Sequence, residues 1–282
     1  MKLRHRICGV LVALLAVSLP PALALDSKLF EARQIAKSCK GAASVSLAAF
    51  KGRDVMCLKG EIDKQMAEDI TKRLGLRPRN LAVVIDSTGG SVLRAINIAD
   101  MLSAHGFDLI VAKACYSSCA NYLFVAANDK FLLEGADIGW HGSTAPRSFD
   151  RYIDIFFAKK KPLGARALKK LRKRYEASKH AQEDFVQKYN ISEDIYFAHW
   201  NAYACATGAR TWNNYRGAEG QRVFSVRWRP SLSNMQNRFG IANVTAAASD
   251  DYADNAVSVT LDDGERELVS VSDRCLFKSR PR

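Results

Sequence analysis

Two apolar runs constrain the fold of this chain most strongly. LAVVID (81–86) and DLIVAKA (108–114) contain few polar residues, which is typical of strands covered on both faces in a parallel sheet. The segment between them, VLRAINIADMLSAHG (92–106), has the apolar spacing of a helix. A strand, a helix and a second parallel strand require a right-handed crossover. We therefore predict an α/β fold built on a parallel sheet.

The same alternation extends on both sides of this unit. DVMCLKGEI (54–62) is expected to be a strand, and KQMAEDITKRLGL (64–76) an amphipathic helix. After the second apolar run, CYSSC (115–119) begins another helix, and two short strands follow at 130–133 and 137–141. The strands of such a series are expected to lie in one sheet.

One domain is expected over residues 25–282. A chain of 282 residues can bury a sizeable core in a single unit, and neither an internal repeat nor a low-complexity linker divides it. The segment at about 144–200 has a mostly helical composition. Late strands are expected at 222–228 and 256–261, on either side of a turn-rich stretch.

The N-terminus has the three parts of a secretory signal peptide. Basic residues in MKLRHR (1–6) precede the apolar run ICGVLVALLAVSL (7–19), and the small residues Ala22 and Ala24 follow it. The pattern predicts a signal peptide at 1–24, cleaved after Ala24. An uncleaved membrane anchor is the alternative, but the run is shorter than the ~20 apolar residues that span a bilayer. We expect a mature protein in the periplasm.

Six cysteines follow the predicted cleavage site, an even number that favours disulfides in an oxidising compartment. Spacing alone does not fix their connectivity. The pairs expected are Cys39 with Cys57 and Cys205 with Cys275, with Cys115 and Cys119 either bonded or reduced. No second Cys/His cluster has the spacing of zinc ligands, so neither a metal nor a cofactor is expected.

The positive charge of the chain is concentrated in one stretch. The formal net charge is +13, and the runs KKK (159–161) and KKLRKR (169–174) lie close together. We expect a solvated helix face with Leu168 and Leu171 on the core side. Attraction of residues 159–174 to an anionic surface, such as a membrane or an acidic substrate, is the alternative. No recognition motif supports a nucleic-acid partner.

Three strand ends carry residues suited to acyl transfer. The run at 81–86 is followed by a turn containing Gly89 and Gly90, the next strand by CYSSC (115–119), and the strand DIGW by His141. The carboxyl ends of parallel strands meet at one edge of a sheet. Paired glycines let backbone amides approach a ligand, and a serine at a helix start lies near amides and the helix dipole. Serine, histidine and amide donors are the minimum for acyl transfer.

These segments resemble a known family. LAVVIDSTGGSVLRAINIADML, CYSSCANYLFVAA and KFLLEGADIGWHGS are similar to the Clp protease proteolytic subunit and its ClpP/crotonase superfamily, and most of all to its exported, cysteine-containing branch. The resemblance covers roughly residues 54–142, and Thr88 stands where the family has proline. It implies a crotonase-like (ClpP-type) spiral of ββα units, serine peptidase chemistry on peptides or proteins, and assembly into homo-oligomers.

The resemblance leaves two alignments for the nucleophile. Matching the apolar helix selects Ser118, whereas matching a Cys-any-Ser-small-Cys pattern selects Ser117. The first is preferred. In that frame the oxyanion hole would consist of the amides of Cys119 and of Gly89 or Gly90.

In the same frame His141 takes the serine proton and returns it to the leaving group. The third member of the family's triad is an acid on a later helix, but no recognisable motif supplies it here. Three acids lie at a suitable distance, and each also fits a plain surface acid: Asp184, Glu193 and Asp194. A serine–histidine dyad is the alternative. His180 and His199 are expected to be exposed or structural.

Three functions fit this set of residues: a serine peptidase, another acyl hydrolase, and a catalytically degenerate ClpP-like fold that acts as a periplasmic binding or scaffold protein. Superfamily members that bind coenzyme A thioesters are a poorer match, because export separates the protein from a cytoplasmic cofactor. We expect an exported serine peptidase.

Overall fold

The computed structural model describes residues 21–41, 43–76, 78, 80–141, 149–150, 153, 163–208, 223–261 and 266–276. Within them lie a larger sheet of seven strands and a smaller sheet of three. The larger sheet contains β1 (Val45–Phe50), β2 (Arg53–Ile62), β3 (Leu81–Gly90), β4 (Phe107–Tyr116), β5 (Lys130–Leu132), β6 (Asp137–Gly139) and β8 (Val244–Ala246). The smaller sheet contains β7 (Val223–Arg229), β9 (Asn255–Leu261) and β10 (Arg266–Val271). The helices are α1 (Pro21–Ser38), α2 (Lys64–Leu74), α3 (Val92–Ser103), η1 (Cys119–Phe124), α5 (Ala165–Tyr189), α6 (Ile195–Thr207), α7 (Leu232–Asn237), η3 (Ser249–Tyr252) and α8 (Asp273–Leu276).

The larger sheet is parallel except at one edge. β2, β3, β4 and β5 run parallel side by side, and β6 also pairs with β4 in parallel. β1 pairs antiparallel with β2 through a hairpin in which Lys51 (φ 48°) and Gly52 (φ 78°) take the left-handed conformation. The prediction that the strands near 55–62, 81–86 and 108–114 share one sheet is confirmed.

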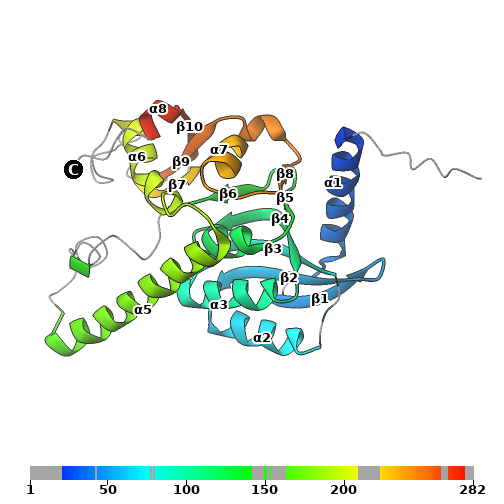
Figure 1. The fold of residues 1–282 in the computed structure, drawn as a ribbon, viewed down its shortest axis with the longest axis horizontal. Helices are drawn as coiled ribbons and strands as arrows, with labels where there is room; N and C mark the ends of the chain where they lie inside the picture. The colour runs from blue at the N-terminus through cyan, green and yellow to red at the C-terminus, as the bar shows by residue number, and fades with distance from the viewer. Residues whose placement is uncertain are drawn as a thin grey trace, which may run out of the picture.

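Helices cover both faces of this sheet, which explains the apolar runs. Along β3, Val83 and Ile85 enter the core beneath α2 and α3, whereas Ala82 and Val84 enter a smaller core against α1. Figure 1 shows α2 and α3 together on one side of the strands and α1 on its own. Because alternate residues are buried on opposite faces, the strand needs apolar side chains at nearly every position.

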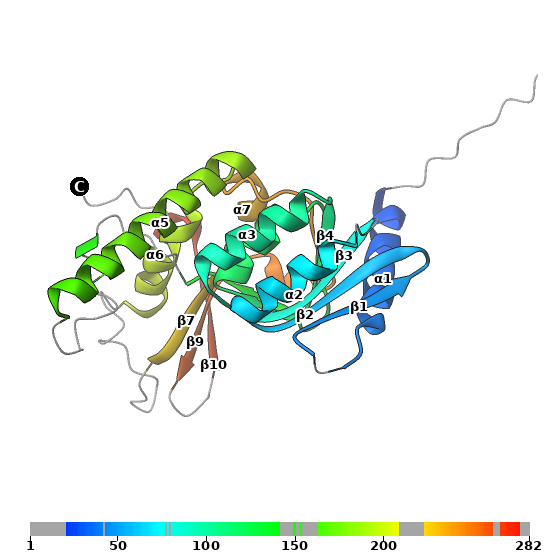
Figure 2. The same cartoon turned by 90° about the horizontal axis from the view of Figure 1, so that it is seen from below.

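The smaller sheet joins the larger one beside the ends of β4 and β6. β7, β9 and β10 are antiparallel, and α6 packs against them (Figures 1 and 2). Trp140, directly after β6, exchanges backbone hydrogen bonds with Trp228 of β7, at N···O distances of 2.7 and 2.6 Å. Both indoles are fully buried, and one continuous core contains residues of both sheets.

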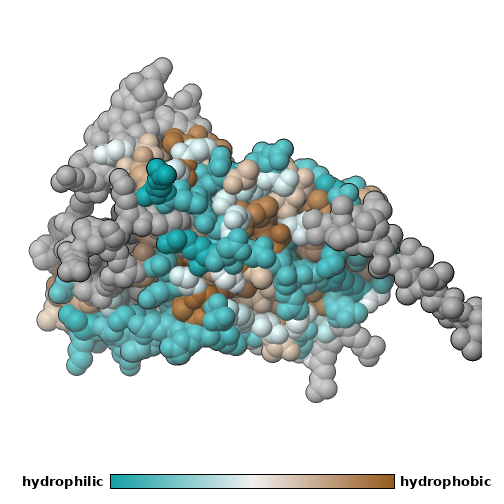
Figure 3. Space-filling view, turned by 45° about the horizontal axis from the view of Figure 1, so that its top comes forward, coloured by the Kyte–Doolittle hydropathy of each residue, from teal (hydrophilic) through white to brown (hydrophobic). Residues whose placement is uncertain are grey.

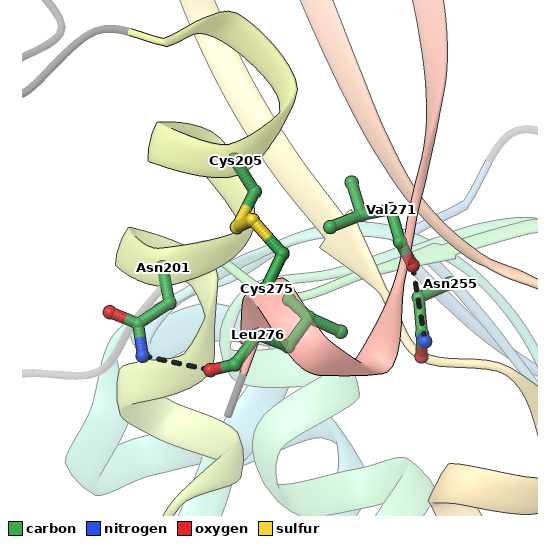
Figure 4. The surroundings of a disulfide bond; sticks show 6 residues. All are labelled: Asn201, Cys205, Asn255, Val271, Cys275 and Leu276. Atoms are coloured by element: carbon green, nitrogen blue, oxygen red, sulfur yellow. Dashed lines mark hydrogen bonds between the residues drawn. A yellow bond between two sulfur atoms is a disulfide. The ribbon is translucent and has the colours of Figure 1, made fainter. Parts of the chain in front are cut away.

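Three disulfides cross-link the described part of the chain. They are Cys39–Cys57 (after α1 to β2), Cys115–Cys119 (β4 to η1) and Cys205–Cys275 (α6 to α8). In Figure 4 the last of these lies beside a hydrogen bond from the Asn201 amide to the Leu276 carbonyl (2.9 Å), so α8 is held to α6 twice. The two pairings predicted from the sequence are confirmed, and the open pair is bonded.

The basic run KKLRKR (169–174) lies on α5, which projects from the body in Figures 1 and 2. Five of its basic side chains are exposed: Lys169, Lys170, Arg172, Lys173 and Arg174. Leu168 and Leu171 are half-buried, as expected for the core side of a solvated helix, and the run at 159–161 lies outside the described residues. On the face shown in Figure 3, apolar patches are small and separated by hydrophilic residues. Among the described helices, none is long and apolar enough to cross a membrane.

Candidate active site

The predicted turn after LAVVID is instead the last part of β3. The strand continues to Gly90 because two glycines there take conformations that other residues rarely adopt, with φ of +92° at Gly89 and +149° at Gly90. A Cβ added to Gly90 would lie 2.5 Å from the Ile62 carbonyl oxygen of β2. At this position the strand can therefore remain beside β2 only because Gly90 lacks a side chain.

Gly89 lies against the loop that carries the two serines. A Cβ on Gly89 would lie 2.5 Å from the Tyr116 carbonyl oxygen and 2.7 Å from the Ser117 Cβ. The backbone of Gly89 therefore approaches the serine loop closely. Its N–H group donates to the Ser87 hydroxyl at 3.1 Å, so this amide already has a partner.

The backbone N–H and C=O groups of Gly90 point toward the serine loop. In a parallel pair of strands, the N–H and C=O groups of one residue form hydrogen bonds with the two residues on either side of its partner. The partner's own N–H and C=O groups then point to the opposite side. Ile62 is paired with Gly90 and accepts a hydrogen bond from Ser91 N–H (2.9 Å), so the N–H and C=O groups of Gly90 face away from β2, toward the serine loop. The Gly90 carbonyl does accept a hydrogen bond from that loop, from the Ser118 hydroxyl at 2.8 Å.

Ser117 is in an uncommon backbone conformation, with a φ of +56°. Its N–H group donates to the Gly139 carbonyl of β6 (3.0 Å), and its carbonyl accepts from Asn121 N–H (2.8 Å). The side chain is half-buried. A left-handed conformation at a residue other than glycine costs free energy, and such residues are frequent at active sites.

Ser118 differs from Ser117 in backbone conformation and in exposure. Its backbone is right-handed helical (φ −60°, ψ −24°), and its side chain is only 1% exposed. Because the hydroxyl donates to the Gly90 carbonyl, it points into the β3 edge.

The helix expected after the serines is present as a π-helix, η1, over Cys119–Phe124, and all its residues are buried. Single π turns inside proteins are rare and occur often at functional sites. The Cys115–Cys119 disulfide joins the end of β4 to the first residue of η1, with a Cα–Cα distance of 5.2 Å. Both cysteines are 0% exposed, so the bond encloses the serine turn without offering sulfur to solvent.

His141 lies at the same sheet edge as the serines. β6 is parallel to β4, and Tyr116 is the partner of Gly139, so Ser118 and His141 each follow the last pair by two residues. His141 as a residue is exposed, yet the protein atoms that surround its ring partly desolvate it and lower its pKa. Within the described residues, no hydrogen bond joins His141 to either serine hydroxyl. Catalytic hydrogen bonds are often long before substrate binds.

Arg227 of β7 adds positive charge beside His141. Its guanidinium stacks on the Tyr116 ring at 4.1 Å, and its side chain packs on Gly139, where an added Cβ would lie 3.0 Å from the Arg227 Cβ. After desolvation, the charge of Arg227 is a further cause that lowers the pKa of His141. No sequence pattern indicated this neighbour, because β7 is distant in the chain.

Arg227→Met is expected to raise the pKa of His141, because the protonated ring would lose a repelling charge. The pKa can be followed by NMR titration of the ring protons. Arg229→Met is a matched control, since Arg229 lies on the same strand but stacks on Tyr252 at 4.4 Å. An unchanged His141 pKa in Arg227→Met, or an equal rise in both variants, would contradict this account.

In the described part of the chain, no hydrogen bond or ion pair joins His141 to the acids considered for the third position. Asp184 and Glu193 are exposed, and Asp194 is half-buried immediately before α6. In the described ranges the one histidine–carboxylate ion pair is His180 with Glu183, on the exposed face of α5 (3.4 Å). No group of three or more potential metal ligands occurs among these residues either.

A protein-family model agrees with this geometry. The model for Clp protease matches residues 40–197, more than half of the chain, and spans the glycine segment, the serine loop and His141. The chain belongs to the Clp protease family. Its mostly parallel α/β sheet is consistent with that membership, which suggests a serine peptidase-like function on peptides or proteins and, as is frequent in the family, oligomers. A search of curated proteins finds no match to this Clp protease family member.

Proposed function

We propose that this Clp protease family member is an exported serine peptidase with Ser117 as its nucleophile and His141 as its base. One observation supports the choice most: Ser117 occupies a strained turn (φ +56°), half-buried, against the Gly89 backbone. The α/β-hydrolases present their serine nucleophile on a comparable strained turn between a strand and a helix, which exposes the hydroxyl at the edge of the sheet. A crotonase-like spiral and a periplasmic location belong to the same proposal.

This choice reverses the order of the two serines that the helix alignment favours. An attacking hydroxyl must reach a substrate carbonyl, and the Ser118 side chain is 1% exposed with its proton donated to Gly90. Ser118 then has a supporting role: its hydrogen bond fixes the glycine segment relative to the loop. Its backbone N–H follows the nucleophile in sequence and is a suitable oxyanion donor.

The reaction follows from these positions. His141 removes the proton from the Ser117 hydroxyl as the oxygen attacks the scissile carbonyl, and the carbonyl oxygen becomes an oxyanion. The amides of Ser118 and Gly90 donate hydrogen bonds to it. His141 then protonates the leaving amine, and a water molecule hydrolyses the acyl-serine by the same route. If Ser118 were the nucleophile instead, the amide of Cys119 would take the place of the Ser118 amide.

A second function, a non-catalytic binding protein with a ClpP-like fold, is favoured by the lack of a hydrogen bond between His141 and either serine in the described residues. The two functions separate in one experiment. Mature protein (residues 25–282) is incubated with a fluorophosphonate probe and, separately, with casein. Covalent labelling together with casein cleavage supports the peptidase, and labelling without cleavage supports another acyl hydrolase. No labelling supports the binding protein.

The disulfide around the serine turn gives a further prediction. Replacing both cysteines by alanine (Cys115→Ala, Cys119→Ala) is expected to lower the free energy of unfolding by about 2 kcal/mol, the chain-entropy effect of so short a loop. It should also slow labelling by the fluorophosphonate probe, because the serine turn loses the covalent bond that restricts its conformation. Cys39→Ala with Cys57→Ala is the control: its 18-residue separation implies a larger stability loss of about 3 kcal/mol, with unchanged labelling of the folded protein. Normal fold and normal Ser117 labelling with lost hydrolysis in the first pair would instead assign a catalytic role to a cysteine.

A further inference from the structure

Arg227 of β7 lies directly beside His141, although β7 is outside the residues that the Clp protease model matches. Trp140 and Trp228 form an antiparallel bridge. In such a pair, the residue after one member lies opposite the residue before the other, so His141 and Arg227 are cross-strand neighbours. The Arg227 stem also packs on Gly139, two residues before His141, where an added Cβ would lie 3.0 Å from the Arg227 Cβ. A cation therefore lies next to the proposed base.

The guanidinium of Arg227 lies over the residue that precedes the nucleophile. Its Cζ atom is 4.1 Å from the centroid of the Tyr116 ring, and Tyr116 is followed directly by Ser117. The Gly139 carbonyl, beneath the Arg227 stem, accepts a hydrogen bond from Ser117 N–H at 3.0 Å. Arg227 thus contacts two residues that are bonded to Ser117, one covalently and one by a hydrogen bond. The residue is half-buried, so part of it faces solvent at this edge of the site.

The charge of Arg227 has no acidic partner among the described residues. A guanidinium has five N–H donors, and here one hydrogen bond, from Nη2 to the neutral Thr260 hydroxyl (3.2 Å), is formed within the described ranges. The Nε atom is buried there without a hydrogen-bond partner. Asp137 accepts from the Tyr116 hydroxyl at the far end of the stacked ring and forms no ion pair with Arg227. Desolvating a charge without a counter-charge costs free energy, so a bound anion would stabilise this arginine.

We propose that Arg227 binds a carboxylate of the substrate, so that the peptidase prefers peptides with an acidic group close to the cleaved bond. A guanidinium can donate two parallel N–H groups to one carboxylate, and stacking on Tyr116 fixes the plane of the fork. Two sources have this chemistry: an Asp or Glu side chain near the cleaved bond, and the C-terminal carboxylate of a short peptide. The inference rests on the proposed function, because it names the substrate class of that site.

Paired substrates test this preference directly. Internally quenched peptides from casein sequences carry Glu, or its uncharged isostere Gln, at each position around the cleaved bond, and each peptide is made with a free and with an amidated C-terminus. We expect kcat/KM to be about 10-fold to 100-fold higher for an acidic peptide than for its neutral counterpart, the effect of a charge-assisted hydrogen bond. A preference for Glu at one position identifies a side-chain carboxylate, and a preference for the free acid over the amide identifies the C-terminal carboxylate.

Two substitutions of Arg227 connect the preference to this side chain. Arg227→Met should lower the ratio of the two kcat/KM values to about 1–3, and Arg227→Lys, which keeps the charge without the planar fork, should retain part of it. The ratio cancels any general effect on His141 or on the amount of folded protein. Arg229→Met is the matched control and should keep the parent ratio, because Arg229 stacks on Tyr252 and donates to the Asp251 carbonyl. An equal ratio in Arg227→Met and the parent would overturn the inference, as would a parent that prefers neutral peptides.

A second readout does not depend on catalysis. In a Ser117→Ala background, fluorescence anisotropy should show that the preferred acidic peptide binds about 10-fold or more tightly than its neutral counterpart, and Arg227→Met should remove this difference. Equal binding of the two peptides, or binding of neither, would overturn the inference. Failure of the parent protein to react with the fluorophosphonate probe and to cleave any peptide, together with binding of acidic peptides that depends on Arg227, would overturn the proposed function alone.

Discussion

Gly89→Ala should nearly abolish reaction with a fluorophosphonate probe and should destabilise the protein by about 2–6 kcal/mol. Two costs add. The residue has a φ of +92°, where an alanine is strained by about 1–3 kcal/mol. Its Cβ would also lie 2.5 Å from the Tyr116 carbonyl oxygen and 2.7 Å from the Ser117 Cβ, and overpacking of this kind costs about 1–3 kcal/mol. Either the glycine segment or the serine turn must move. Loss of one oxyanion donor typically lowers a rate ~10²–10³-fold, so movement of this segment should have at least that effect.

Gly135→Ala is the matched control for this substitution. Gly135 also has a positive φ (+68°), but an added Cβ would meet nothing within 4 Å. We expect it to cost about 1–2 kcal/mol, the strain alone, and to leave labelling of the folded protein unchanged. Urea unfolding and labelling rates measure both effects. Similar losses of labelling in the two variants would show that the contact between Gly89 and the serine loop has no part in the reaction.

Ser117→Ala should eliminate probe labelling, whereas Ser118→Ala should retain it at a reduced rate. The first change removes the attacking oxygen. The second removes a buried hydrogen bond to the Gly90 carbonyl, which should cost about 1–3 kcal/mol of stability because that carbonyl loses its partner. The two variants should therefore lose different properties: Ser118→Ala is the less stable variant, and Ser117→Ala is the one that does not react with the probe.

His141→Ala is expected to lower the labelling rate almost as far as Ser117→Ala, since an unassisted serine hydroxyl is a poor nucleophile near neutral pH. His180→Ala is the control, because His180 is exposed on α5 and ion-paired with Glu183. Retained labelling in Ser117→Ala together with its loss in Ser118→Ala would move the nucleophile by one residue. Full labelling of the double alanine variant would remove the serine loop from the reaction.

Much of the fold could be predicted because its signals are local. Val83 and Ile85 face one core while Ala82 and Val84 face the other, so the continuous apolar run LAVVID predicts burial on both faces. The sheet edge that collects Gly89, the serine loop and His141 follows from the parallel order of the strands.

The details that decide the chemistry depend on contacts distant in sequence. The left-handed conformation of Ser117 coincides with its bonds to Gly139 and Asn121, and the extension of β3 depends on the space beside Ile62.

The most direct test of the account is to identify the residue that reacts with the probe in the unmodified mature protein. Trypsin cleavage after Lys113 and Lys130 releases residues 114–130, a peptide that contains both serines. After reduction of its disulfide, fragmentation mass spectrometry distinguishes an adduct on Ser117 from one on Ser118. The account predicts a single adduct, on Ser117, that is lost in His141→Ala. An adduct on Ser118, or the absence of any adduct on this peptide, would contradict it.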